Sequence, residues 1–358
     1  MPKNIVICCD GTKNEYGPEN TNVVKLYSVL EVDPARQVVY YHPGLGTMGA
    51  PNALTAPAKW WTRILGLAFG YGLSQHIADL YGFLMEQYQP EDRIFVFGFS
   101  RGAYTARALC STLRMFGLIR EDDDILIPYA VRMLKKCKDV TFTVAEGFKR
   151  TFSREVKPYF VGVWDTVSSV GALHNPVKLP FSARNPDIVI GRHAVAIDER
   201  RAFYRQNLWF PLPGQNIKQV WFAGAHCDVG GGYPEPDSGL SKIALEWMVA
   251  EARAAGLLVN QPELDRILGR SGAGYALPDP AATLHNSLKW WWWAELIPRR
   301  YTSLRSAERK KKWKLPLGRR RFIADGSLIH ESVFQRMQAL PRYHPPNLPG
   351  TYTIEPTR

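Results

Sequence analysis

The chain has 358 residues, of which 46% are hydrophobic and 22% are charged. This composition excludes a disordered chain, a collagen and a coiled coil, and the length suits one large domain with insertions or two modest ones. The formal net charge is +12, and most of it arises between Arg299 and Arg321, where eleven Lys or Arg accompany the single acid Glu308. An anionic partner is therefore expected to bind that segment.

The N-terminal apolar run is too short for a secretory signal, and no window approaches the roughly 18 apolar residues of a membrane span. The five cysteines are scattered and form no CxxC pair, so neither a disulfide framework nor a zinc site is expected, and no cofactor is predicted. These features favour a cytoplasmic location, with peripheral membrane attachment or export by a machine that needs no signal peptide as alternatives.

Strand-like and helix-like stretches alternate along the chain. Strands are predicted at 4–9, 37–42, 93–99, 158–167 and 219–233, and helices at 22–30, 60–87, 103–117 and 241–256. The alternation predicts an α/β fold with a mostly parallel sheet and helices on both faces. We expect a core over 1–256, a basic Trp-rich insertion or cap over 257–321, and a return to the core over 322–358 that carries the catalytic histidine and a C-terminal tail.

The stretch GFSRG, residues 98–102, fits the GxSxG nucleophile elbow, in which a serine sits on a tight turn between a strand and a helix. Glycines flank the serine because strand and helix approach closely there. The strand before it and the helix after it supply the expected context, so the motif predicts an α/β-hydrolase-like fold with Ser100 as nucleophile. The alternative is a capping serine in a glycine-flanked turn.

A serine nucleophile needs a histidine base and an acid, which follow the serine in the order acid, then histidine, in such folds. We favour His330, in a late turn before the closing helix, over His226. For the acid we favour Asp228 over Asp165. His226 and Asp228 are two residues apart at a predicted strand end, so their side chains are expected on one face of the sheet.

Acyl transfer also needs two donors for the oxyanion. The first is predicted to be the backbone N–H of Arg101, the residue after the nucleophile. The second is expected in the loop after the first strand, at Gly11 or Thr12.

A minor alternative is a metal-dependent hydrolase, in which Asp10, Asp165 and Asp228 hold a hard cation. The sequence CDGT resembles the start of magnesium-dependent phosphatases that use an aspartate two residues earlier as nucleophile. Cys8 occupies that position here. The favoured interpretation therefore contains no metal.

Six motifs occur together in the chain: CDGTKNEYGPENTNVVKLY, YYHPGLGT, GFSRGAYTAR, VGVWDTVSSVG, AIDERR and VWFAGAHCDVGGGY. In this order they resemble the bacterial and fungal α/β-hydrolase domains related to phospholipase effectors of the type VI secretion system. The resemblance implies a Ser-Asp-His hydrolase that acts on phospholipid, with Ser100, Asp228 and His330 in these roles.

The segment 290–321 joins four consecutive tryptophans to a basic run. Aromatic rings favour a bilayer interface and cations favour anionic lipid, so this segment predicts contact with an anionic membrane surface. The alternative is that the tryptophans pack as core under a solvated basic face. Nucleic acid is not expected, because the aromatics are not interleaved with the charges.

The prediction for the whole chain is a serine carboxylester hydrolase, a phospholipase or lipid esterase that works through an acyl-enzyme. The alternative from another class is a peripheral membrane or anionic-polymer binding protein on an inactive hydrolase fold.

Overall fold

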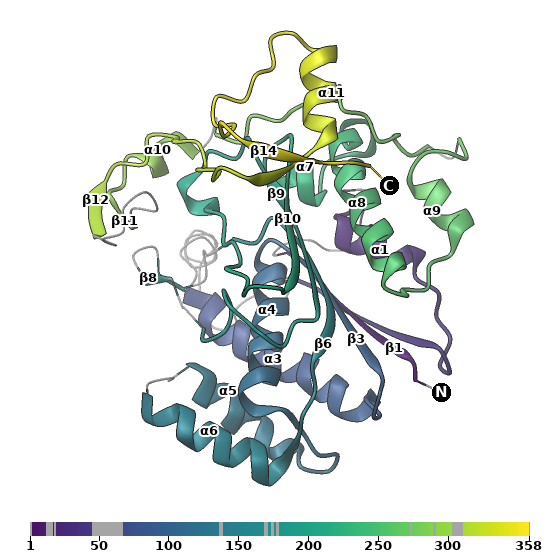
Figure 1. The fold of residues 1–358 in the computed structure, drawn as a ribbon, viewed down its shortest axis with the longest axis vertical. Coiled ribbons are helices and arrows are strands. Elements are labelled where there is room, and N and C mark those ends of the chain that lie inside the picture. Colours follow the sequence, from purple (N-terminus) through teal and green to yellow (C-terminus); the bar gives the residue numbers. More distant parts are fainter. Residues whose placement is uncertain are drawn as a thin grey trace, which may run out of the picture.

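The computed structural model gives the arrangement of most of the chain (Figure 1). It describes residues 2–11, 17, 19–44, 67–135, 139–167, 171–172, 175–176, 179–272, 274–288, 291–302 and 311–357.

Eight parallel strands form the central sheet. Their spatial order is β14-β13-β10-β9-β6-β3-β1-β2. The strands are β1 (Asn4–Cys9), β2 (Gln37–His42), β3 (Arg93–Phe99), β6 (Pro158–Trp164), β9 (Ile190–Ala196), β10 (Asn216–Phe222), β13 (Ser327–His330) and β14 (Tyr352–Glu355). All six residues of β1 are buried, as expected for a parallel strand that is covered on both faces.

Helices cover both faces of this sheet (Figure 1). The helices of the described residues are α1 (Asn22–Val29), α3 (Leu67–Gln87), α4 (Arg101–Phe116), α5 (Ile127–Lys135), α6 (Asp139–Phe152), α7 (His226–Gly230), α8 (Gly239–Ala254), α9 (Gln261–Ile267), α10 (Trp292–Glu295) and α11 (Glu331–Ala339), with 3-10 turns η1 (Asp124–Leu126), η2 (Ala202–Tyr204) and η3 (Glu235–Asp237). Three short two-stranded pairs complete the description: β4 (Leu118–Ile119) with β5 (Ser153–Arg154), β7 (Gly171–Ala172) with β8 (Asn175–Pro176), and β11 (Arg299–Thr302) with β12 (Lys311–Lys314).

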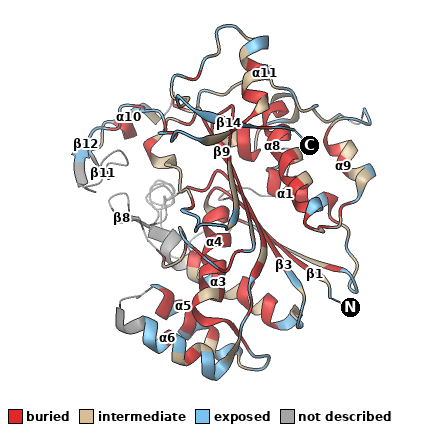
Figure 2. Cartoon of the chain, in the orientation of Figure 1, coloured by how far each residue is buried: buried red, intermediate tan, exposed pale blue. Residues whose placement is uncertain are grey.

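Alternate residues of β1 point into two separate cores. Ile5 and Ile7 of β1 pack with α3, α4, α5 and α6 on one face. Val6 and Cys8 pack with α1, α8 and α9 on the other. Figure 2 shows the buried residues concentrated in the strands and in the helix faces turned toward them. The predicted α/β class, with a mostly parallel sheet between helices, is confirmed.

Most predicted elements occur where the sequence places them. Thr21 caps α1, and its hydroxyl accepts a hydrogen bond from the Val24 N–H. The predictions missed β9, because Arg192 and His193 interrupt its apolar pattern. Both side chains are nevertheless buried, and Arg192 is paired with Glu251 of α8. They also missed β14 and the helices α5 and α6.

The helices and strands after residue 290 lie in two different parts of the structure. α10 and the β11–β12 hairpin lie outside the central sheet, to one side of it (Figure 1). β13 and β14 add to the sheet beside β10. Within the described residues, no helix is both long and apolar enough to cross a membrane.

Candidate active site

Ser100 lies at the turn between β3 and α4, where the sequence predicts a nucleophile. Its backbone has φ 59° and ψ −118°, a conformation that side-chain-bearing residues seldom adopt. The N–H of Ser100 donates to the carbonyl of Trp164 at the end of β6, 3.1 Å away. This strained turn fixes the hydroxyl at the carboxyl edge of the sheet and at the N-terminus of α4.

The two glycines of the motif are required by packing. A Cβ at Gly98 would lie 2.7 Å from the carbonyl oxygen of Gly102. A Cβ at Gly102 would lie 2.2 Å from the carbonyl oxygen of Cys9 and 2.4 Å from that of Asp10. The start of α4 can therefore approach the end of β1 only without side chains at these positions.

Ser100 begins a chain of three hydrogen-bonded side chains. Its Oγ is 2.7 Å from Nε2 of His226, the first residue of α7 after β10. Nδ1 of the same ring is 2.6 Å from Oδ2 of Asp165, which directly follows β6. All three residues are buried, and Asp165, like Ser100, has a positive φ, of 36°. The residues follow the order serine, acid, histidine along the chain.

Arg321 holds the other side of Asp165. Its two terminal nitrogens donate to the two carboxylate oxygens, and the Nη2 to Oδ2 distance is 3.0 Å. Nη1 also donates to the carbonyl of Ala196, and Nη2 to that of Tyr204. Arg321 was expected in the basic insertion as part of a solvated or lipid-facing run. It is instead buried beneath the site, and no local sequence pattern distinguishes it from Arg319 and Arg320.

The electrostatic environment fixes the proton arrangement of these groups. Burial alone would raise the pKa of Asp165, but Arg321 and His226 more than offset this and hold it well below its usual range. Burial lowers the pKa of His226, although the hydrogen bond to Asp165 opposes the shift. At neutral pH the carboxylate is ionised and the ring is neutral. An ionised carboxylate only accepts, so Nδ1 carries the proton and Nε2 is free to accept from Ser100.

The favoured acid, Asp228, does not lie beside His226 as expected, so this prediction needs correction. Residues 226–230 form the helix α7 rather than the end of a strand. Residues two apart on a helix do not face each other, so the side chains of His226 and Asp228 diverge. Asp228 instead accepts from the Ala225 N–H at 2.9 Å and contacts Nδ1 of His285 at 2.6 Å.

The favoured base, His330, is also placed elsewhere. It caps α11, where its Nδ1 accepts from the Ser332 N–H and lies 2.8 Å from the Ser332 hydroxyl. Its ring stacks on Phe222 with centroids 4.5 Å apart, and burial lowers its pKa to about 4. These contacts suit a structural histidine. The structure thus brings Ser100 together with the alternates Asp165 and His226.

The predicted oxyanion donors are only partly described. Arg101 is the first residue of α4, so its N–H lies at the positive end of the helix dipole. The Gly11 N–H does not fit its predicted role, because it donates to Oδ1 of its neighbour Asp10 at 2.6 Å. Thr12 lies outside the described residues.

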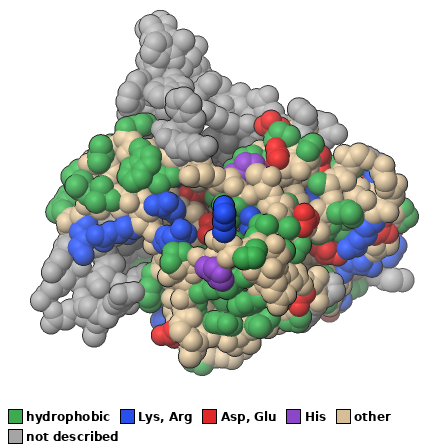
Figure 3. Space-filling model, turned by 90° about the horizontal axis from the view of Figure 1, so that it is seen from above, with side chains coloured by type: hydrophobic (Ala, Val, Ile, Leu, Met, Phe, Trp, Pro, Cys, Tyr) green, Lys and Arg blue, Asp and Glu red, His purple; other side chains and the backbone are tan. Residues whose placement is uncertain are grey.

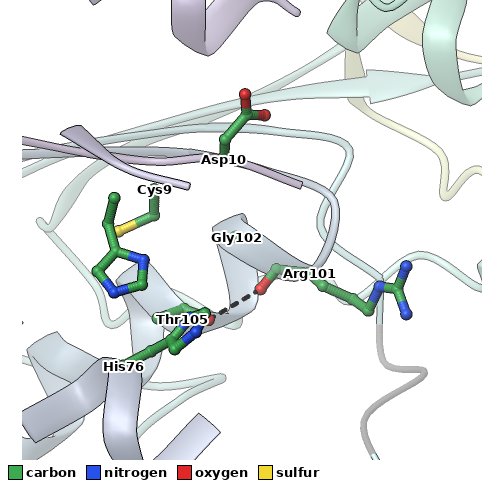
Figure 4. A pocket seen from close by; sticks show the side chains of 7 residues that line it. Cys9, Asp10, His76, Arg101, Gly102 and Thr105 are labelled. Atoms are coloured by element: carbon green, nitrogen blue, oxygen red, sulfur yellow. Dashed lines mark hydrogen bonds between the residues drawn. The ribbon is translucent and has the colours of Figure 1, made fainter. Parts of the chain in front are cut away.

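A small hollow borders this end of the sheet. Figure 4 shows the side chains that line it, gathered around the start of α4 and the end of β1. They are Cys9, Asp10, His42, His76, Arg101, Gly102 and Thr105.

The three aspartates proposed for a metal site lie in separate networks. Asp10 accepts from Thr21 and Tyr41, at 2.9 and 2.8 Å from the two hydroxyls. Asp165 and Asp228 are engaged by the groups described above. Among the described residues, no group of three or more His, Cys, Asp or Glu is arranged to hold a metal ion. The geometry therefore gives the metal-dependent alternative no support.

Aromatic rings lead from His226 into the insertion. Tyr204 meets the His226 ring edge-on at 4.7 Å, and Trp291 contacts Tyr204 at 6.0 Å. Trp291 in turn stacks on Trp293, with centroids 6.4 Å apart. Trp293 is 47% exposed and its neighbour Trp292 is 48% exposed. The tryptophan run thus has one member packed toward the site and two at the surface, while Trp290 lies outside the described residues.

Comparison with known protein families shows which family the chain belongs to. The model of the type VI secretion system (T6SS) phospholipase effector Tle1-like catalytic domain matches residues 3–251. The chain belongs to this family. The resemblance predicted from the six motifs is confirmed, and the family is one of phospholipases. The matched range of this Tle1-like domain contains Ser100, Asp165 and His226.

Two further comparisons concern proteins that are not characterised. "Uncharacterized protein YEL023C" of Saccharomyces cerevisiae is 37% identical over 227 residues, which cover 59% of this chain and 33% of that protein. The Tle1-like chain thus matches about a third of the length of this relative. An uncharacterised protein from Pseudomonas aeruginosa has a solved structure with a TM-score of 0.46 and 20% identity, over 77% of this chain and 49% of that one.

Proposed function

We propose that this Tle1-like domain is a serine hydrolase of phospholipids or other lipid esters, with Ser100, His226 and Asp165 as its catalytic triad. The observation that carries the proposal is the hydrogen-bonded chain from Ser100 Oγ through both nitrogens of His226 to Asp165. Membership of a phospholipase family supports the substrate class. The buried, strained serine on a nucleophile elbow supports the mechanism.

In the proposed first step, Ser100 Oγ attacks the ester carbonyl carbon while His226 Nε2 takes the hydroxyl proton. The tetrahedral intermediate collapses, the bond to the alcohol breaks, and His226 returns the proton to the departing alcohol. The acyl group remains on Ser100. Water then attacks this acyl-enzyme with the same base, which releases the fatty acid and restores the serine.

Charged and dipolar groups support this cycle. The oxyanion would form near the N-terminus of α4, where the Arg101 N–H and the helix dipole favour negative charge. Asp165 stabilises the imidazolium that forms on His226 in each step. Arg321 acts through Asp165 as a positioning residue, because it keeps the carboxylate ionised and fixes both of its oxygens.

The direct test is hydrolysis of a panel of phospholipids and neutral esters by wild type and by Ser100→Ala. The proposal expects release of fatty acid by wild type and loss of activity on every substrate in the variant, by a factor on the order of 10³ or more. A matched control is Ser28→Ala, because Ser28 lies on α1 and its hydroxyl donates to the nearby Lys25 carbonyl. Equal hydrolysis by wild type and Ser100→Ala would reject the assignment.

The second proposal concerns binding to an anionic membrane. Seven exposed large hydrophobics lie between residues 292 and 322, at the end of the insertion and directly after it: Trp292, Trp293, Leu296, Trp313, Leu315, Leu317 and Phe322. Lys314 and Arg319 lie in the same segment and are also exposed. In the view from above, Lys and Arg side chains form a band beside hydrophobic ones (Figure 3). This combination favours the interface of a bilayer that contains anionic lipid.

This binding is separable from hydrolysis. In the Ser100→Ala background, replacing Trp292, Trp293 and Trp313 by alanine should abolish cosedimentation with vesicles that contain phosphatidylserine. Ile125→Ala is the matched control, because Ile125 is 82% exposed and lies before α5, outside the insertion. If the triple variant binds the vesicles as well as its parent, the docking surface is wrong.

A further inference from the structure

A second pocket lies beyond the ends of β9 and β10 and is not used by the proposed triad. Its cavity of about 240 Å³ has room for roughly eight water molecules. Four separate segments line it, and its charged and titratable residues are Asp198, Arg200, His285, Arg320, Arg342 and His344. Three arginines and two histidines thus face a single aspartate.

The aspartate in this pocket is already engaged. Asp198 Oδ2 accepts from the Gly224 N–H at 2.9 Å and from the Tyr343 hydroxyl at 2.7 Å. Its Oδ1 is 3.4 Å from Arg320. The formal charge of the lining is +2 with both histidines neutral. The pocket therefore favours a compact anion that accepts several hydrogen bonds.

Several lining residues are held in place from behind. Nε of Arg200 donates to the Gly318 carbonyl at 2.9 Å, which fixes one edge of its guanidinium. His285 is held by Asp228 through its Nδ1 and stacks on Tyr233 at 3.7 Å, so Nε2 is its remaining polar atom. Asp228, which the sequence suggested as triad acid, thus orients a pocket residue instead. Such fixed donors are typical of a built site.

The pocket is connected to the triad by short links. The Ser287 hydroxyl donates to Glu199 Oε2 at 3.3 Å, and the same oxygen accepts from the His226 N–H at 3.2 Å. Arg320 directly precedes Arg321, which binds Asp165. Glu199 thus contacts both the pocket, through Ser287, and the triad, through the His226 backbone. In a glycerophospholipid, the phosphate is joined to the acyl esters through a single glycerol unit.

From these observations we propose that the pocket binds the phosphate group of the lipid substrate through Arg200, Arg320, Arg342 and the two histidines. The inference rests on the proposed function, since it assigns the head-group subsite of the same reaction. Arginine forks match two phosphate oxygens at once, while the histidine nitrogens and the Asn286 amide offer further donors. The neutral glycerol and acyl chains would extend from the pocket toward Ser100.

Binding can be tested without hydrolysis. Isothermal titration of Ser100→Ala with glycerol 3-phosphate should give saturable 1:1 binding, and glycerol should give none. The double variant Arg342→Gln, His344→Gln should weaken binding by about 10-fold or more, because charge-assisted hydrogen bonds are lost. Both residues are exposed, so the fold is expected to survive. Arg150→Gln on α6 is the matched control and should bind like its parent. Absence of binding to the parent would overturn the proposal.

A kinetic comparison separates a head-group site from a site for free phosphate esters. The double variant should lower the ratio of kcat/KM on a phospholipid to kcat/KM on a neutral short-chain ester by about 10-fold, mainly through KM. If glycerol 3-phosphate binds but this ratio does not change, the head-group assignment is wrong. Failure of Ser100→Ala to stop hydrolysis would reject the proposed triad and leave the titration result standing.

Discussion

His226 Nε2 lies 2.7 Å from Ser100 Oγ, although 126 residues separate the two in the chain. The contact depends on sheet order, because β3 and β10 are separated only by β6 and β9. The loops after β3, β6 and β10 all emerge at the carboxyl edge, where α/β sheets collect their functional groups. The His226 ring is held between Phe99 and Tyr204, with centroids 4.6 and 4.7 Å away. Packing thus sets the ring orientation before any substrate arrives.

The first prediction separates the two possible histidines. His226→Gln should reduce kcat on any ester substrate by a factor on the order of 10³ or more, because the base is lost. His330→Gln should retain activity within about 10-fold and lower the free energy of unfolding, because His330 caps α11 and stacks on Phe222. Steady-state kinetics and urea denaturation of both variants provide the measurement. The opposite ranking of the two kcat values would refute the assignment.

The second prediction concerns the dependence of activity on pH. The proposed mechanism requires neutral His226 and ionised Asp165. Burial lowers the pKa of His226 below its ordinary value of about 6.5, and Arg321 keeps that of Asp165 low. The acid limb of kcat/KM should therefore lie below pH ~6.5, with activity lost as pH falls through the lowered pKa of His226. A profile between about pH 4 and 9 would show it. An acid limb at or above pH ~6.5 contradicts the described environment.

The third prediction concerns Arg321. Without Arg321, the buried carboxylate of Asp165 has one partner fewer. Arg321→Gln should therefore lower the free energy of unfolding by about 3–5 kcal/mol and lower kcat. The pKa of Asp165 is lower in the folded chain than its unfolded value of about 4, so the ionised carboxylate stabilises the fold above pH ~4. This stability is lost as pH falls toward the folded pKa. The variant should therefore show a weaker decline of unfolding free energy below pH ~4.

Two further variants distinguish the positioning of Asp165 by Arg321 from a general loss of stability. Arg321→Lys restores a charge without the fork and should recover part of kcat. Arg150→Gln removes an exposed charge on α6, outside the insertion, and should behave like wild type. Equal kcat in Arg321→Gln, Arg321→Lys and wild type would show that the arginine does not position Asp165.

The fourth prediction compares two glycines. Gly102→Ala would place a methyl 2.2 Å from the Cys9 carbonyl, so α4 must shift, at a cost of about 1–3 kcal/mol or more, and Ser100 must move with it. A methyl at Gly147 on α6 would meet no atom within 4 Å, so Gly147→Ala should stabilise the protein by ~0.5–1 kcal/mol. Thermal unfolding and ester hydrolysis measure both effects. An active, fully stable Gly102→Ala would show that the close approach is unnecessary.

The position of Ser100 at a turn between a strand and a helix is predicted well because its signal is local. A strand, two glycines around a serine and a helix start occur within a few residues, and each follows from the same tight turn. The sheet and most of its strands are also predictable, since buried parallel strands are uniformly apolar. β9 is not predicted, because the polar residues Arg192 and His193 interrupt its apolar pattern. Their partners, Glu251 and Gln219, come near only in the folded chain.

The side chains that join Ser100 in its hydrogen-bonded chain are harder to predict, because their signals are not local. The pairing of His226 with Asp228 assumed strand periodicity, whereas the chain forms a short helix there. His330 is favoured by its late position in the chain and by the family resemblance, neither of which reports a contact with Ser100. Arg321 has no sequence signal, because its role depends on a contact with Asp165 across 156 residues.

The most direct test of the central claim is covalent labelling by a fluorophosphonate, followed by mass spectrometry of the modified peptide. The probe reacts with a serine that an adjacent base has activated. The account predicts one adduct, on Ser100, in wild type and in His330→Gln, with labelling absent in Ser100→Ala and strongly slowed in His226→Gln. Equal labelling of wild type and Ser100→Ala, or no labelling of folded wild type, would contradict it.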